Sequence, residues 1–216
     1  MKEMKGPGGP FEKLGVYKQQ KIMLASINEF ASKGFTAAST DAIAGRAGVS
    51  KGAIFHYFGT KEKLYIVTAE YILDGYVDHM EKYLEKAPND IFEMFQSMVF
   101  AGLDYLLGKN LSIYKLHGLI STLELGEEAH KNMREKIESR TGRLIEDYFK
   151  KVKKSRLKID APEVIRAIMW ISDSLDREVL GLLTSKTTVD DIKNMYKKRM
   201  PLVAQMLRNG IYKYGK

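Results

Sequence analysis

The sequence predicts an all-α protein in which a small N-terminal three-helix domain precedes a larger helical domain. Apolar residues recur at the three- and four-residue spacing of amphipathic helices along most of the 216 residues. No segment alternates apolar and polar residues as a β-strand does, and no strand–helix–strand pattern or internal repeat occurs. An apolar fraction of 44% and a charged fraction of 29% are typical of a soluble globular protein.

The composition also excludes several classes of function. The chain has no cysteine, which removes disulfides, thiolate catalysis and zinc sites built on sulfur. No apolar run reaches the roughly 20 residues that a membrane span needs. The first ten residues lack the apolar core of a secretory signal. We therefore expect a cytoplasmic protein without membrane attachment.

The N-terminal region is expected to begin with a mobile arm over residues 1–16, because its first ten positions are rich in Gly and Pro. A first helix is expected from about Tyr17 to Lys33, ending at Gly34. Its inward face would carry apolar residues such as Ile22 and Phe30.

Two short helices joined by a glycine-containing turn are predicted next. Ser39 can cap the first and Ser50 the second, because a hydroxyl oxygen accepts from the free N–H groups at a helix start. Gly48 stands where a left-handed residue ends the first of these helices. Such a pair is a helix-turn-helix, whose second helix can enter the major groove of DNA.

A set of residues across this region, continuing into a fourth helix, matches one known pattern without a gap. The matching residues are Ile22, Ala25, Phe30, Gly34, Phe35, Ser39, Ile43, Ala44, Ala47, Gly48, Val49, Ser50, Gly52, Ile54, Phe55, Tyr57, Phe58, Lys61, Glu62 and Leu64. They resemble the DNA-binding domain of the TetR family of transcriptional regulators, which would then occupy residues 17–63. Two positions depart from the family pattern. Phe55 replaces a common tyrosine whose hydroxyl binds phosphate, and Ala42 replaces an acidic residue near Ser39.

The first turn of the second short helix is the expected site of base contacts, since recognition helices reach base edges with their N-terminal residues. Lys51 can donate to guanine, and the Ala53 methyl can pack on a thymine methyl. The alternative is that Lys51 and Lys61 are solvated charges and Tyr57 a packing residue, but the motif around the two lysines favours DNA contact. The predicted DNA-binding residues are Ser39, Thr40, Ser50, Lys51, Gly52, Ala53, His56, Tyr57 and Lys61.

Charge is distributed unevenly along the chain. Residues 1–63 hold ten Lys or Arg against five Asp or Glu, a balance that suits a phosphate backbone. Residues 186–216 hold eight Lys or Arg against two Asp or Glu. We interpret this excess of positive charge as a solvated helix face.

The remaining residues, 64–216, are predicted to form further helices. Expected segments are Thr60 to about Lys86, Asp90 to about Gly108, residues 111–120, Glu127 to about Lys154, a helix after the box Asp160-Ala-Pro-Glu163, and a last helix from about Thr188. Pro201 is expected to kink or break the last helix.

The last two helices carry more apolar residues than one core face requires, which indicates a second burial partner. In the resembled family these helices pair with their copies in a four-helix bundle, and the domain encloses a mostly apolar ligand pocket. The resemblance therefore implies a homodimeric repressor that binds a palindromic operator in double-stranded DNA and is released by a small, mostly apolar effector. Candidate pocket residues, each of which can instead be core, are Phe95, Met98, His117, Trp170 and Asp173. Asp173 can alternatively pair with Arg177.

Two other functions would share some of these sequence features. An architectural DNA-binding protein without an effector would share the basic N-terminus. A helical-bundle enzyme with a di-metal site needs two Glu-x-x-His steps, and only Glu127 to His130 provides one. No Gly-rich phosphate loop occurs either. We therefore expect no catalytic residue, no metal and no cofactor.

Overall fold

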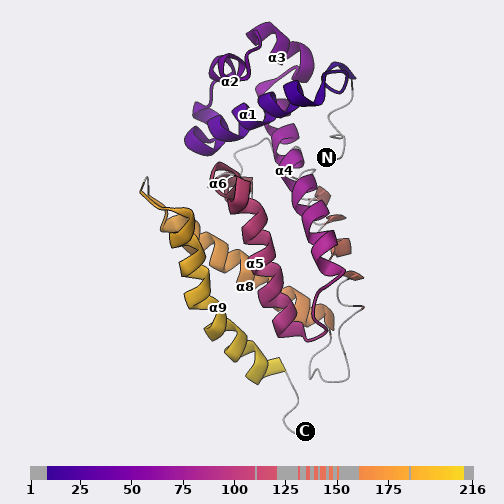
Figure 1. The fold of residues 1–216 in the computed structure, drawn as a ribbon, viewed down its shortest axis with the longest axis vertical. Helices are drawn as coiled ribbons and strands as arrows, with labels where there is room; N and C mark the ends of the chain where they lie inside the picture. The colour runs from indigo at the N-terminus through magenta and orange to yellow at the C-terminus, as the bar shows by residue number, and fades with distance from the viewer. Residues whose placement is uncertain are drawn as a thin grey trace. The chain divides into compact units, whose positions relative to one another are not determined.

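The computed structural model of the chain describes residues 9–109, 111–120 and 161–211 except 185, with scattered positions between 131 and 150. In these ranges the chain forms a short 3₁₀ helix followed by α-helices (Figure 1). The elements are η1 (Gly9–Phe11), α1 (Val16–Ala37), α2 (Thr40–Ala47), α3 (Lys51–Phe58), α4 (Lys61–Leu84), α5 (Ile91–Lys109), α6 (Leu111–Ile120), α8 (Ala161–Gly181) and α9 (Val189–Ile211). The described residues include no strand, which confirms the all-α fold class.

Contacts between Cα atoms divide the chain into two compact units. The first comprises Met1–Tyr76 and Lys109–Ile137, and the second Val77–Gly108 and Glu138–Lys216. In the first unit α1 packs against α2 and α6, and in the second α8 packs against α9. The expected boundary between residues 63 and 64 stays a prediction. No helix among the described residues is long and apolar enough to cross a membrane.

Most of the expected helix boundaries are confirmed by their capping contacts. Asp90 accepts from the backbone N–H groups of Phe92 and Glu93, at 3.0 and 3.2 Å. The Thr60 hydroxyl accepts from Lys63 N at 3.0 Å. Helix α6 occupies the predicted residues 111–120. The helix predicted from Glu127 to about Lys154 lies largely outside the described residues.

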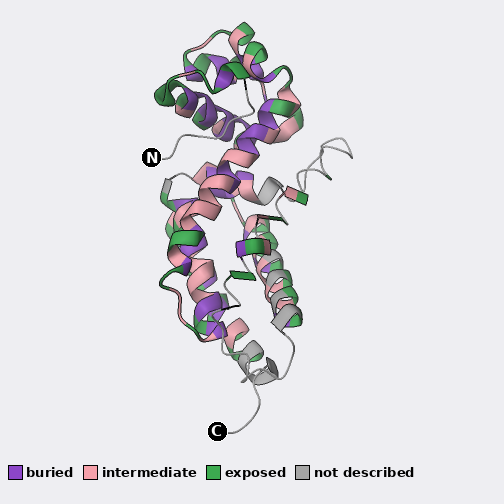
Figure 2. Cartoon of the chain, turned by 90° about the vertical axis from the view of Figure 1, so that its right-hand side faces the viewer, coloured by how far each residue is buried: buried purple, intermediate pink, exposed green. Residues whose placement is uncertain are grey.

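Helix α1 ends its regular course at Gly34, as predicted, and continues for one more turn. Gly34 has φ 70° and ψ 178°, a conformation that a side chain would strain. Buried residues, among them Ile22, Ile27 and Phe30, recur along the inward side of α1 (Figure 2). This face supplies the third wall around α2 and α3.

Two expectations about the ends of the chain are wrong in part. A break in the last helix at Pro201 does not occur, because α9 remains helical across it, whereas a kink there stays a prediction. Pro201 and Lys197, the residue whose carbonyl loses its usual donor, are both exposed, so water can replace the missing hydrogen bond. The mobile arm predicted over residues 1–16 is also wrong for its second half. There Phe11 is buried and anchors η1 to the first unit.

Candidate nucleic-acid interface

Helix α2 has the predicted caps at both ends. The Ser39 hydroxyl accepts from Ala42 N at 3.3 Å. Gly48 adopts the left-handed conformation, with φ 70° and ψ 36°, and its N–H bonds to Gly45 O at 3.2 Å. This left-handed residue turns the chain toward α3, as in a helix-turn-helix.

Helix α3 presents its first turn to solvent. The Ser50 hydroxyl accepts from Ala53 N at 3.1 Å and fixes the helix start. Ile54 and Phe58 are buried, whereas Lys51 and Gly52 are exposed. The residues predicted to reach base edges therefore lie on the open side of the helix. Their contact with DNA stays a prediction.

Lys51 is held by an ion pair in the free protein. Its Nζ lies 2.7 Å from Asp41 Oδ2 in the first turn of α2, and both side chains are more than half exposed. Thr40, next to Asp41 in the first turn of α2, is buried in the free protein, and its predicted phosphate contact stays a prediction.

A buried carboxylate joins α1 to both ends of α2. Glu29 is fully buried and accepts from Ser39 N at 3.0 Å and from Arg46 Nη1 at 2.6 Å. Lys33 Nζ lies 2.9 Å from the same group. Burial raises the pKa of Glu29, but hydrogen bonds from Lys33, Ser39 and Arg46 outweigh it and hold the pKa below its usual value of 4.5. Ala42 has no carboxylate that could accept from the Ser39 N–H, and Glu29 accepts from that N–H instead.

Lys61 lies against backbone carbonyls at the start of α4. Its Nζ donates to Thr36 O at 3.0 Å and to Ala38 O at 3.1 Å, and it sits 4.9 Å from the Phe35 ring centroid. A phosphate contact, as predicted for this residue, would compete with these bonds. In the free protein Lys61 ties the connection between α1 and α2 to α4.

The segment before α1 contributes an aromatic contact to the recognition helix. The Phe11 ring lies 4.9 Å from the Phe58 ring and 6.3 Å from the Tyr57 ring. His56, whose side chain is exposed in the C-terminal half of α3, lies with its ring 5.6 Å from that of Tyr57. Phe55 is partly exposed, so the missing tyrosine hydroxyl leaves an apolar edge at the surface.

Sequence reasoning missed the roles of Phe11, Gln19 and Glu29. The sequence did contain a signal for Gln19 and Glu29. Together with Ser26, they recur at seven- and three-residue intervals, which places all three on the buried face of α1. Polar residues at inward positions need hydrogen-bond partners, and this spacing could have marked them as structural links.

The predicted effector-pocket residues occupy different environments. Phe95 is buried and Met98 half-buried on α5, while Trp170 on α8 is 72% exposed. The ring of His117, on α6, lies 5.8 Å from the ring of Tyr76 and is tilted by 35° to it. The side chain of Asp173 lies outside the described residues. The pocket they were predicted to line stays a prediction.

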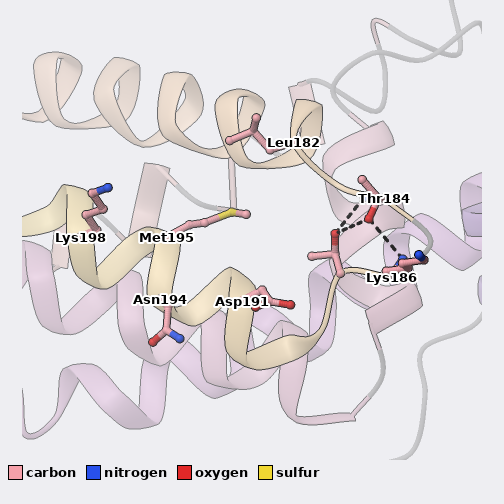
Figure 3. A pocket seen from close by; sticks show the side chains of 8 residues that line it. Leu182, Thr184, Lys186, Asp191, Asn194, Met195 and Lys198 are labelled. Carbon is pink, nitrogen blue, oxygen red and sulfur yellow. Dashed lines mark hydrogen bonds between the residues drawn. The ribbon is translucent and has the colours of Figure 1, made fainter.

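One open groove of about 560 Å³ lies in the second unit, at the connection between α8 and α9 (Figure 3). Its lining residues are Leu182, Thr184, Lys186, Thr187, Asp191, Asn194, Met195 and Lys198. Thr184 and Thr187 bond to each other across the turn, and Thr188 and Asp191 cap α9 reciprocally. Six of the eight lining residues have polar side chains, although more of the lining surface is apolar than polar. No group of three or more metal-ligating side chains occurs in the part of the chain that the structure describes.

Comparisons with known proteins agree with this geometry. A sequence model of the family described as bacterial regulatory proteins, tetR family, matches residues 22–67. The HTH-type transcriptional regulator YerO of Bacillus subtilis is 34% identical over 80 residues, 35% of this chain and 28% of that protein. The regulator RutR of Escherichia coli is 35% identical over 68 residues, 32% of each chain. The chain thus matches about a third of the length of these curated relatives.

Solved structures show the same fold over most of the chain. A TetR family transcription regulator from Marinobacter aquaeolei has a TM-score of 0.63 at 18% identity, covering 91% of this chain and 96% of that one. FadR from Bacillus subtilis, solved in complex with stearoyl-CoA, has a TM-score of 0.66 at 16% identity, covering 86% and 97%. Residues 22–67, which form the helix-turn-helix, thus match the tetR family of bacterial regulatory proteins, and the chain as a whole shares the fold of solved TetR family regulators.

Proposed function

We propose that this chain is a repressor that binds a palindromic operator as a homodimer and is released by a small, mostly apolar effector. The observation that carries the proposal is the open first turn of α3. A helix start capped by Ser50 and flanked by the exposed Lys51 and Gly52 has the geometry of a major-groove reading helix.

On DNA, Lys51 would exchange its ion pair with Asp41 for a guanine O6 or N7 acceptor. Gly52 permits close approach, and Ala53 offers its methyl group to a thymine methyl. We propose further contacts with phosphates or base edges by Ser39, Thr40, Ser50, His56 and Tyr57. We assign Lys61 to the connection between α1 and α2, because two carbonyls already bind its ammonium group.

Exposed apolar side chains on the last two helices support the homodimer. Trp170 is 72% exposed on α8, and Leu202 and Met206 are 55% and 67% exposed on α9. Leaving such side chains in water is unfavourable, and pairing with a second copy would bury them. A twofold dimer would then read two half-sites about one helical turn, roughly 34–36 Å, apart or a multiple of it.

We propose that residues 17–63 form the DNA-binding domain and residues 64–216 the effector and dimerisation domain. FadR from Bacillus subtilis, which shares the fold, binds stearoyl-CoA in its solved complex. That likeness supports a ligand-binding role for the helical domain here but does not identify the ligand. A regulator of chromosomal DNA would act in the cytoplasm.

The test is a selection of random duplex DNA by the purified full chain at roughly physiological salt, with Lys51→Ala and Lys63→Ala as variants. Lys63 is an exposed lysine on the first turn of α4 and serves as the matched control. We expect an enriched inverted repeat that is lost in Lys51→Ala and kept in Lys63→Ala. If no DNA sequence is enriched and binding simply weakens as the salt concentration rises, the protein is an architectural DNA binder and the proposal fails.

A further inference from the structure

We propose that η1 braces the recognition helix, and that Phe11 and Gln19 are positioning residues for operator recognition. The inference rests on the proposed function, because it concerns how accurately α3 is presented to DNA. None of the positions that match the family lies before residue 22, so the brace stands outside the matched segment.

Helix α3 depends on its neighbours for its position. It has eight residues, just over two turns, and helices of that length are marginal on their own in water. Gly52 lowers its intrinsic propensity further. Only Ile54 and Phe58 are buried along it, so few side chains fix its orientation.

Phe11 is one of the neighbours that fix this orientation. Its side chain is 1% exposed, and its ring packs at 4.9 Å on Phe58, with an interplanar angle of 50°. The edge contact with Tyr57 at 6.3 Å extends the packing along the helix. Both partners lie in the C-terminal half of α3. The brace therefore holds the helix at one end and leaves Lys51 and Gly52 at the other end open.

Gln19 fastens the brace to α1. Its side chain is almost fully buried, and the two N–H groups of its Nε2 are shared among the carbonyls of Phe11, Glu12 and Leu14, at 3.2, 3.2 and 2.9 Å. The N–H of Leu14 also bonds to Phe11 O at 3.1 Å, which closes the segment into a turn. Three carbonyls gathered on one buried amide give the segment a fixed conformation, so Phe11 meets α3 as part of the folded first unit rather than as a loose tail.

A loosened α3 would lose base contacts before it loses phosphate attraction. Hydrogen bonds to base edges depend on direction and distance, whereas attraction to the phosphate backbone depends mainly on net charge. Removing Phe11 changes no charge. We therefore expect the ratio of operator binding to non-specific binding to fall, while the binding of unrelated DNA stays the same.

The experiment compares the full chain with Phe11→Ala, Phe11→Leu and Met23→Ala, using fluorescence anisotropy on the selected operator and on a scrambled duplex. Met23 is buried on α1 and serves as a control for loss of core packing. Phe11→Ala should weaken operator binding by about tenfold or more, comparable to the loss of one base contact. Binding to the scrambled duplex and the salt dependence of binding should not change. Phe11→Leu should restore most of the operator affinity.

Different results of this experiment would overturn the brace or the proposed function. An unchanged operator-to-scrambled ratio in Phe11→Ala, or an equal fall in Met23→Ala, overturns the brace. If circular dichroism shows Phe11→Ala unfolded, Gln19→Leu is measured instead, since it keeps the ring and removes the three hydrogen bonds. An unchanged ratio in that variant likewise overturns the proposal. Failure of the unmodified chain to discriminate the two duplexes would refute the proposed function itself.

Discussion

Replacing Glu29 should destabilise the DNA-binding region, because its carboxylate links α1 to both ends of α2. The side chain is fully buried and accepts from Ser39 N, Arg46 and Lys33. Removing it leaves the Ser39 N–H without its acceptor, at a cost of about 1–3 kcal/mol. The Arg46 and Lys33 side chains are 53% and 46% exposed, so water can solvate them and each lost ion pair adds at most about 1 kcal/mol.

The expected loss of unfolding free energy is therefore about 3 kcal/mol for Glu29→Ala. Glu29→Gln keeps an oxygen for Ser39 N–H and loses only the charge, so we expect about 1 kcal/mol. Urea unfolding at neutral pH measures the loss of unfolding free energy in both variants. Equal m-values for the variants and the unmodified chain would show that their unfolded states are comparable. Glu81→Gln is the matched control, since Glu81 is exposed on α4.

The pH dependence has a definite sign. Hydrogen bonds hold the folded pKa of Glu29 below its usual 4.5, so the unfolded chain binds this proton more readily. Its contribution is fully present above about pH 4.5 and is lost as the pH falls through the lower, folded value. The stability difference between the unmodified chain and Glu29→Gln should then shrink below pH 4.5. A difference that is absent at neutral pH, or that is constant on acidification, would refute the assignment.

Two further substitutions test the charges around the interface. Asp41→Asn should bind DNA of any sequence a few-fold more tightly at low salt, because it frees Lys51 and removes a charge that repels phosphate; equal anisotropy curves for the two proteins would exclude this role. Lys61→Met should lower thermal stability by about 1 kcal/mol through its lost carbonyl contacts. The salt slope of its operator binding should not change, whereas a slope reduced by about one would identify Lys61 as a phosphate contact.

The sequence by itself determined the local architecture of this protein. Ser39, Gly48 and Ser50 act on backbone groups within five residues of themselves, so their spacing was enough to predict both caps and the turn. The same holds for Asp90, whose acceptor oxygen reaches Phe92 and Glu93. Local hydrogen bonds of this kind depend on residue type and spacing alone.

Tertiary structure decided how these helices are held against one another. Glu29 meets Ser39 and Arg46 at separations of 10 and 17 residues, and Lys61 reaches Thr36 across 25 residues. Phe11 contacts Phe58 across 47 residues of sequence. No periodicity in the sequence specifies which distant groups meet, because such pairs form only after the helices pack. Helix α3 is thus predictable from its own residues, while the contacts that orient it come from residues far away in the chain.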